Sequence, residues 1–204
     1  MTHNLHLVDV KLKEVEGKLF PKGYAYPFWN RYPHLAQILH QLYDGQVQGI
    51  KVLDLACGVG GGVRYLRKEF GIDAFGMDAN LEESLREEDE SKDSKYTREL
   101  RDLMQKGITI NDSVENVDVY FNENSFDVFS IVYFGGFPIL SKNVRNTNRT
   151  VKEKLSSILK PNGYQIKVRE DDEWHPCWNI PGNYVWVLKK EQAGSFTGVK
   201  QHQK

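Results

Sequence analysis

The 204-residue sequence is poor in cysteine, carries almost no net charge and contains no long hydrophobic run. Its two cysteines, Cys57 and Cys177, lie far apart, which argues against a disulfide framework and predicts a reducing, cytoplasmic environment. No segment approaches the roughly 18 apolar residues of a membrane-spanning helix, and the N-terminus lacks a signal-type apolar core. A formal net charge of −1 gives no global attraction to nucleic acid or to an anionic membrane, so neither is an expected partner.

What the chain does contain is enough apolar material for one well-packed domain, since 40% of its residues are hydrophobic. We expect three parts: an N-terminal helical and aromatic cap segment over 1–45, an α/β domain over 46–190, and a loose polar tail over 191–204. Pro33 is expected to open a helix that ends near Gly45. The preceding segment 20–32 holds six aromatic residues, which either pack over the edge of the sheet or form a lid over the site.

A glycine-rich turn organises the α/β domain. Residues 50–55 read as a short buried strand, and Val63, Leu66 and Phe70 follow at helical spacing, so the glycines in 58–62 connect a strand to a helix. Such turns bind nucleotide-like ligands, because glycine lets the backbone approach closely and the helix start offers free N–H donors.

The residues around the turn separate two ligand classes. A dinucleotide fingerprint places a third glycine where this chain has Val63. The strand also ends in Asp54, whose carboxylate repels a pyrophosphate and attracts a cationic amino-acid ligand. The pattern therefore favours a cationic ligand over NAD.

The segment 53–61, Leu-Asp-Leu-Ala-Cys-Gly-Val-Gly-Gly, closely resembles the first motif of class I S-adenosylmethionine-dependent methyltransferases. Most members carry glycine where this chain has Ala56. The resemblance extends over about 46–189 and implies a Rossmann-like three-layer α/β sandwich, with a seven-stranded, mostly parallel sheet and an antiparallel C-terminal hairpin. It implies S-adenosyl-L-methionine as cofactor, with its amino-acid end near Asp54, Ala56, Gly58 and Gly60.

Two later strands end in acids that the resemblance assigns to the rest of the cofactor. Asp78, followed by Ala79, ends a strand over 72–77, where an acid binds the ribose hydroxyls. Asp112 and Ser113 follow a strand over 108–110, where the family places an acid against the adenine amino group. Each of the two acids has a helix-capping role as its alternative.

The downstream pieces arrive in the order expected for this family. A Phe-Asp-Val triplet opens a buried strand over 126–133, and Asp127 at its start is expected to be structural. A Leu-Lys-Pro-x-Gly turn at 159–163 precedes a fifth strand over 164–168. Segments 174–178 and 184–189 then read as a hairpin.

Methyl transfer is an in-line displacement on an activated group, so the protein supplies mainly alignment. An acceptor that must lose a proton would use a base, and Tyr133 and His175 are the candidates, with Tyr133 also a cofactor neighbour. A packed, structural role for His175 stays open. His175 and Cys177 lack further ligands at suitable spacing, so no metal site is expected.

The acceptor is not defined by a motif. The Asn-Pro-Pro-aromatic tetrad of adenine and glutamine amide methylases is missing, and Phe-Gly-Gly-Phe-Pro occupies its place at 134–138. Aromatic residues that could wall a pocket favour a small-molecule acceptor: Tyr24, Tyr26, Phe28, Trp29, Phe134 and Phe137. The alternatives are a protein or nucleic-acid acceptor, a non-catalytic cofactor-binding module and, least favoured, an NAD-dependent oxidoreductase; the oligomeric state is left open.

Overall fold

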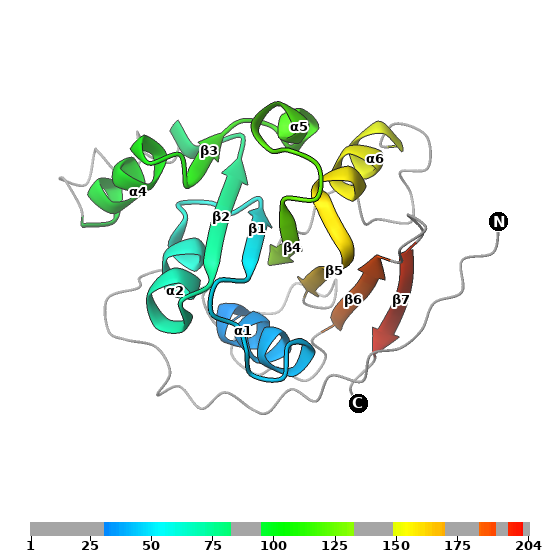
Figure 1. The fold of residues 1–204 in the computed structure, drawn as a ribbon. Coiled ribbons are helices and arrows are strands. Elements are labelled where there is room, and N and C mark those ends of the chain that lie inside the picture. Colours follow the sequence, from blue (N-terminus) through cyan, green and yellow to red (C-terminus); the bar gives the residue numbers. More distant parts are fainter. Residues whose placement is uncertain (1–30, 83–94, 133–148, 170–183, 191–195, 202–204) are drawn as a thin grey trace.

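The computed structural model describes residues 31–82, 95–132, 149–169, 184–190 and 196–201. With the labels of Figure 1, the elements are α1 (Arg31–Leu42), β1 (Lys51–Leu55), α2 (Gly61–Phe70), β2 (Asp73–Asp78), α4 (Lys95–Gln105), β3 (Thr109–Asn111), η2 (Val114–Asn116), α5 (Val117–Tyr120), β4 (Phe126–Val132), α6 (Arg149–Ile158), β5 (Leu159–Arg169), β6 (Tyr184–Lys190) and β7 (Phe196–Gln201). Within these ranges no helix combines the length and apolar content that crossing a bilayer requires.

Seven strands form one sheet in the order β3-β2-β1-β4-β5-β6-β7. The first five strands run parallel, whereas β6 pairs antiparallel with β5 and β7 pairs antiparallel with β6. The order 3-2-1-4-5 is that of a doubly wound α/β fold, whose strand order reverses between β1 and β4. The expected Rossmann-like sheet is therefore confirmed, including its antiparallel C-terminal hairpin.

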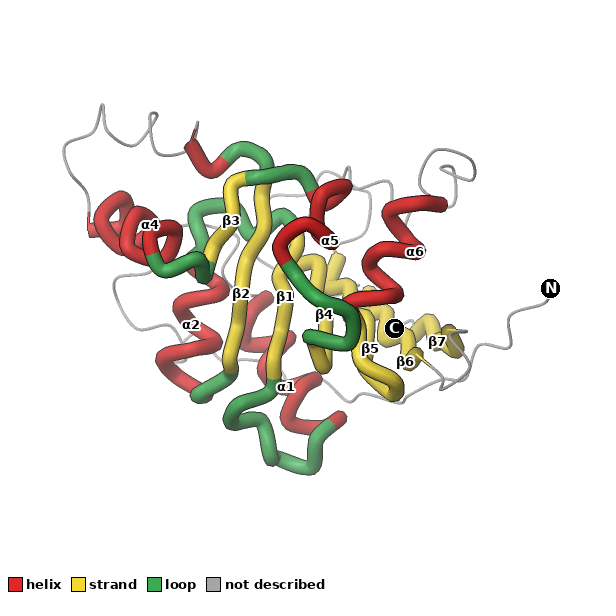
Figure 2. Tube along the Cα trace, turned by 45° about the horizontal axis from the view of Figure 1, so that its top comes forward, coloured by secondary structure: helices red, strands yellow, loops and turns green. Residues whose placement is uncertain are grey.

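Helices cover both faces of this sheet, which gives three layers (Figures 1 and 2). Along β1, Val52 belongs to a core cluster shared with α1, α2 and α4, whereas Leu53 and Leu55 belong to a second cluster shared with α5 and α6. This alternation follows from the two-residue period of a strand. It also directs Asp54 toward the face that α1 and α2 cover.

The central strand β4 is almost fully buried, as expected for a strand covered on both faces. Asp127 near its start accepts hydrogen bonds from the Lys51 backbone N–H at 2.9 Å and from Lys160 Nζ at 2.8 Å. Both partners lie at the amino ends of the parallel strands, away from the edge where ligands bind. The structural role expected for Asp127 is confirmed.

The first helix begins earlier than the sequence pattern suggested. α1 starts at Arg31, so Pro33 lies inside its first turn, where a missing N–H costs no intrahelical bond. Tyr32 consequently belongs to the helix rather than to the aromatic segment that precedes it, and it is buried at 8% exposure.

Two expectations about the C-terminal half need correction. β5 begins at Leu159 because the Pro-Asn-Gly residues bulge out of the ladder: Phe126 pairs with Leu159, and Val128 pairs with Tyr164. Residues 196–201 are not loose but form β7, since they pair with β6 and extend the sheet. The hairpin is therefore β6–β7, and segment 174–178 lies outside the described residues.

Candidate ligand-binding site

The acidic residues that the sequence singled out lie at, or directly after, the ends of neighbouring strands. Leu55 of β1 pairs with Met77 of β2 and with Ile131 of β4, and Asp78 pairs with Asn111 of β3. Because these strands are parallel, their carboxyl ends meet at one edge of the sheet. Asp54, Asp78 and Asp112 are thereby brought to the same edge, beside the reversal point where α/β sheets bind ligands.

The glycine-rich turn needs left-handed backbone at three alternate positions. The φ angles of Ala56, Gly58 and Gly60 are 56°, 52° and 69°. Glycine adopts this conformation freely, whereas an L-residue such as Ala56 is strained there by roughly 1–2 kcal/mol. The Met77 carbonyl holds the strained segment by accepting from the N–H groups of Ala56 and Cys57, at 2.8 and 3.3 Å. The left-handed angle explains why the motif that this segment resembles ordinarily has glycine where this chain has Ala56.

Val63 stands where a dinucleotide fingerprint has its third glycine, and β2 compensates for it. A Cβ built on Gly76 of β2 would lie 2.9 Å from Val63 Cγ2 and 2.5 Å from Cys57 Sγ. The glycine that permits close helix–sheet packing is thus on the strand instead of the helix. Val63 therefore does not discriminate between ligand classes, and Asp54 is the residue that disfavours a pyrophosphate.

Asp54 is fully buried and holds two hydroxyl donors. Tyr32 of α1 donates from its hydroxyl to Oδ2 at 2.6 Å, and Ser130 of β4 donates to Oδ1 at 2.9 Å. Burial raises the pKa of Asp54 from 3.8 to about 7, against the lowering effect of the two hydrogen bonds, and nearby Asp78 raises it further. The charge of this carboxylate is consequently poised near neutral pH.

The Tyr32 ring lies directly over the start of α2. A Cβ built on Gly62 would fall 1.8 Å from Tyr32 Cζ, so only glycine leaves room for the ring. Burial, followed by the charge of Asp54, raises the pKa of Tyr32, so its hydroxyl stays protonated and remains a donor. α1 is thereby fastened to both the turn and the strand end.

Asp78 braces the turn from the neighbouring strand. Its carboxylate accepts from the Gly58 N–H at 3.0 Å and from the Asn80 N–H at 2.9 Å. Each carboxylate oxygen has a second lone pair, so Asp78 retains capacity for further donors. Ala79 is exposed directly after it, and Asn111 Oδ1 accepts from the Leu81 N–H at 3.0 Å, which joins the ends of β2 and β3.

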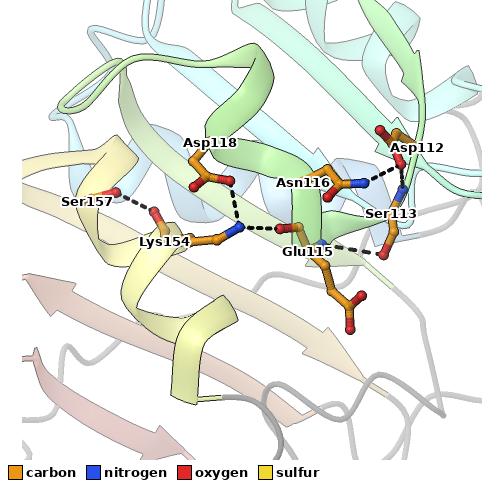
Figure 3. A network of polar contacts seen from close by, with 7 residues as sticks. All are labelled: Asp112, Ser113, Glu115, Asn116, Asp118, Lys154 and Ser157. Atoms are coloured by element: carbon orange, nitrogen blue, oxygen red, sulfur yellow. Dashed lines mark hydrogen bonds and ion pairs between the residues drawn. The ribbon is translucent and has the colours of Figure 1, made fainter.

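Asp112 lies beyond β3 and has protein donors on both oxygens, of which Ser113 and Asn116 are drawn in Figure 3. Its Oδ1 accepts from the Ser113 N–H at 2.6 Å and from Asn116 Nδ2 at 2.9 Å, and its Oδ2 accepts from the Tyr120 hydroxyl at 2.7 Å. The hydrogen bonds from Asn116, Tyr120 and Ser113 lower the pKa of Asp112. Ser113 caps η2 by accepting from the Glu115 N–H at 3.4 Å.

A lysine of α6 supports the same loop from the side (Figure 3). Lys154 Nζ donates to the Glu115 carbonyl at 2.8 Å and pairs with Asp118 at 2.9 Å, while the Lys154 carbonyl accepts from Ser157 Oγ at 2.7 Å. The hydrogen bond from Lys154 lowers the pKa of Asp118. α6 therefore holds the segment η2–α5, whose Asn116 and Tyr120 donate to Asp112.

Several predicted residues fall outside the described part of the chain. These are the two base candidates, Tyr133 and His175, and the aromatic residues considered for the pocket wall. Within the part of the chain that the structure describes, no three His, Cys, Asp or Glu side chains gather closely enough to hold a metal ion.

Two residues of the site, Ser130 and Asn111, were not predicted from the sequence, whereas Tyr32 was among the six aromatic residues of 20–32 without an expected partner. Ser130 carried a signal, because it is the one hydroxyl inside the apolar run of β4 and faces Asp54 across the ladder. Asn111 is a polar residue at a strand end, next to Asp112. The contact between Tyr32 and Asp54 gave no sequence signal, since it depends on where α1 packs.

No family model and no curated protein matches the sequence. Among solved structures, the chain resembles Haemonchus contortus phosphoethanolamine N-methyltransferase 2, at 22% identity over 69% of this chain and 28% of that one, with a TM-score of 0.43. It also resembles Burkholderia thailandensis 1,6-didemethyltoxoflavin-N1-methyltransferase, at 18% identity over 82% and 60% of the two chains, with a TM-score of 0.45. The chain spans 28% to 48% of the lengths of the first three structures it matches. The order and register of its own strands identify the chain as a Rossmann-like α/β protein.

Proposed function

We propose that this protein binds S-adenosyl-L-methionine and transfers its methyl group to a small-molecule acceptor. The observation that carries the proposal is the placement of Asp54, Asp78 and Asp112 at one sheet edge, around a turn with left-handed backbone at three alternate positions. A sulfonium cofactor with an ammonium group, a ribose and an adenine offers one suitable partner to each acid. The sequence motif at 53–61 points to the same cofactor.

Each acid would act on a different part of the cofactor. Asp54 attracts the cationic amino-acid end toward the turn. Because Asp54 is fully buried, this attraction is electrostatic and does not require a direct hydrogen bond. Asp78 accepts from the ribose hydroxyls with the lone pairs that Gly58 and Asn80 leave open. Asp112 receives the adenine amino group. The protein's contribution to transfer is then alignment of the methyl group with the acceptor, with Tyr133 or His175 as base where a proton must leave.

Replacing Asp78 by alanine should weaken S-adenosylmethionine binding at least tenfold in titration calorimetry, because hydrogen bonds to a charged acceptor are worth about 1.5–3 kcal/mol. Asp73→Ala is the matched control: it removes an acid from the other end of the same strand, where Asp73 pairs with Arg67 at 2.7 Å. Equal affinities for the wild type and Asp78→Ala would remove Asp78 from the site.

The role of Asp112 can be tested with a cofactor analogue in which inosine replaces adenosine, so that a carbonyl stands in place of the amino group. If Asp112 accepts from the amino group, the wild type should bind the analogue about tenfold less tightly than S-adenosylhomocysteine, and Asp112→Ala should lose this discrimination. Tyr120→Phe, which removes one donor to the same carboxylate, should keep it. Equal discrimination by the wild type and Asp112→Ala would show that Asp112 only caps the loop.

Turnover separates an enzyme from a module that binds cofactor without using it. Radiolabelled methyl groups should pass from S-adenosylmethionine to a component of a small-molecule extract, and substitution of Asp78 should reduce the transfer. Tight cofactor binding without transfer to small-molecule, protein or nucleic-acid pools would favour the non-catalytic module. A thermal shift with NAD but none with S-adenosylmethionine would favour an oxidoreductase instead.

A further inference from the structure

Asp54 is a buried carboxylate without a cation among the described residues. The groups that face it are the hydroxyls of Tyr32 and Ser130, the Cys57 thiol and the Asp78 carboxylate. Buried charges in proteins are ordinarily paired, and two neutral hydroxyls neutralise none of the charge of Asp54. A cationic group at the turn would supply the missing partner.

Tyr32 is the contact between this carboxylate and the outer helix layer. Its ring occupies the space that the missing Cβ of Gly62 leaves at the start of α2, and its hydroxyl reaches Asp54 at 2.6 Å. The same residue therefore controls two things: the packing of α1 on the turn and the hydrogen bonding of the buried acid. Ser130 takes part only in the hydrogen bonding of Asp54, because it lies on β4 within the sheet and does not contribute to the packing of α1.

We propose that Tyr32 is a positioning residue of the ligand site: its hydroxyl holds and stabilises the Asp54 carboxylate that a cationic ligand requires, and its ring seats α1 over the turn. The inference rests on the proposed function, since the cation in question is the ammonium group of S-adenosylmethionine. With Tyr32, α1 becomes part of the ligand site. The sequence motif alone places that site at the strand ends and the turn.

The consequence is a specific dependence of affinity on pH. Burial raises the pKa of Asp54 to about 7, so the carboxylate ionises and affinity for a cation increases as the pH rises through that value. The Tyr32 hydrogen bond lowers this pKa, because it stabilises the charged form. Removing the bond moves ionisation, and with it the rise in affinity, to higher pH. Cys57, Asp78 and Tyr32 are the other titratable groups that face Asp54, and the burial of Cys57 and Tyr32 raises both of their pKa values.

The test is Tyr32→Phe, which keeps the ring over Gly62 and removes only the hydroxyl. We expect the pH of half-maximal S-adenosylmethionine affinity to rise by about one unit, which lowers affinity at pH 7 roughly fivefold relative to the wild type and removes the difference between the two proteins near pH 9. Ser130→Ala, which removes the donor to the other carboxylate oxygen of Asp54, should shift the midpoint in the same direction. Tyr43→Phe is the control, because the Tyr43 hydroxyl donates to the Asp127 carbonyl at 3.4 Å, at the opposite end of the strands.

Calorimetry from pH 5.5 to 9.5 distinguishes the outcomes, with the melting temperature of each variant confirming that it is folded. Unchanged midpoints in Tyr32→Phe, beside a wild type that binds the cofactor, overturn the role of Tyr32 and leave the proposed function intact. Equal loss of affinity at every pH also overturns it, since a purely structural defect has no reason to recover when Asp54 ionises. Absence of binding by the wild type at every pH overturns the proposed cofactor and the inference together.

Discussion

Replacing Asp54 by asparagine should make the protein more stable above pH 7 while it loses affinity for S-adenosylmethionine. The folded-state pKa of about 7 lies above the ordinary value of 3.8, so burial penalises the charged form of Asp54. The unfolded chain ionises near 3.8 and the folded protein only near 7, which means that stability falls as the pH rises between these values. The shift corresponds to roughly 4 kcal/mol above pH 7, at about 1.36 kcal/mol per unit.

Asparagine retains an oxygen for the Tyr32 hydroxyl and cannot ionise, so the variant lacks this penalty. Melting temperatures measured from pH 4 to 8.5 should be similar for the two proteins at pH 4 and should diverge in favour of Asp54→Asn as the pH rises to 7.5. Cofactor affinity at pH 8 should fall at least tenfold, because the site loses its charge. If the melting temperatures of the two proteins differed by the same amount at every pH, the pKa of Asp54 would be the same in the folded and the unfolded chain.

A gain in stability together with a loss of affinity would identify Asp54 as a binding residue that costs the folded protein stability. A buried acid that only joined α1 to the sheet would be replaced by asparagine with little loss of affinity. Asp127 is the useful contrast at the other end of the strands, since it pairs with Lys160. Asp127→Asn should lower stability slightly and leave cofactor affinity unchanged.

The strand ends could be predicted from the sequence because they depend on local patterns. Apolar runs that end in Asp54 and Asp78 indicate both the strands and their direction, and parallel pairing then brings the acids to one edge. The glycines of the turn report a backbone requirement, which the left-handed angles of Gly58 and Gly60 confirm. Such features need no knowledge of how distant segments pack.

The partners of the acids depended on tertiary packing and were therefore missed. Tyr32 reaches Asp54 only because α1 crosses the start of α2, and a single sequence does not report that crossing. β7 was missed because its residues are mostly polar and form a strand only by extending the edge that β6 offers. The close packing of Val63 of α2 against Gly76 of β2 is likewise a contact between separate elements, which a single sequence does not report. Local sequence patterns thus predict where the site lies, and packing determines how its charges are tuned.

Substituting alanine for Gly62 should destabilise the protein by about 1–3 kcal/mol, the usual cost of overpacking a core. In most helices the same change stabilises by up to about 1 kcal/mol, because alanine is the better helix former. Here the new Cβ would fall 1.8 Å from a ring carbon of Tyr32, so the ring must move. Moving it draws the hydroxyl away from Asp54, and we expect the variant to bind cofactor less tightly at pH 7.

A double-mutant cycle with Tyr32→Ala separates this clash from any other effect at position 62. Without the ring, Gly62→Ala should be neutral or stabilising in urea unfolding, so the sign of its effect reverses between the two backgrounds. The cofactor affinity of Tyr32→Ala should also be insensitive to the second change, because the hydrogen bond to Asp54 is already absent. If Gly62→Ala were equally destabilising in both backgrounds, glycine would be required there by the backbone or the ligand. A reversal would instead show that glycine is required at position 62 because it leaves space for the Tyr32 ring, whose hydroxyl donates to the buried Asp54.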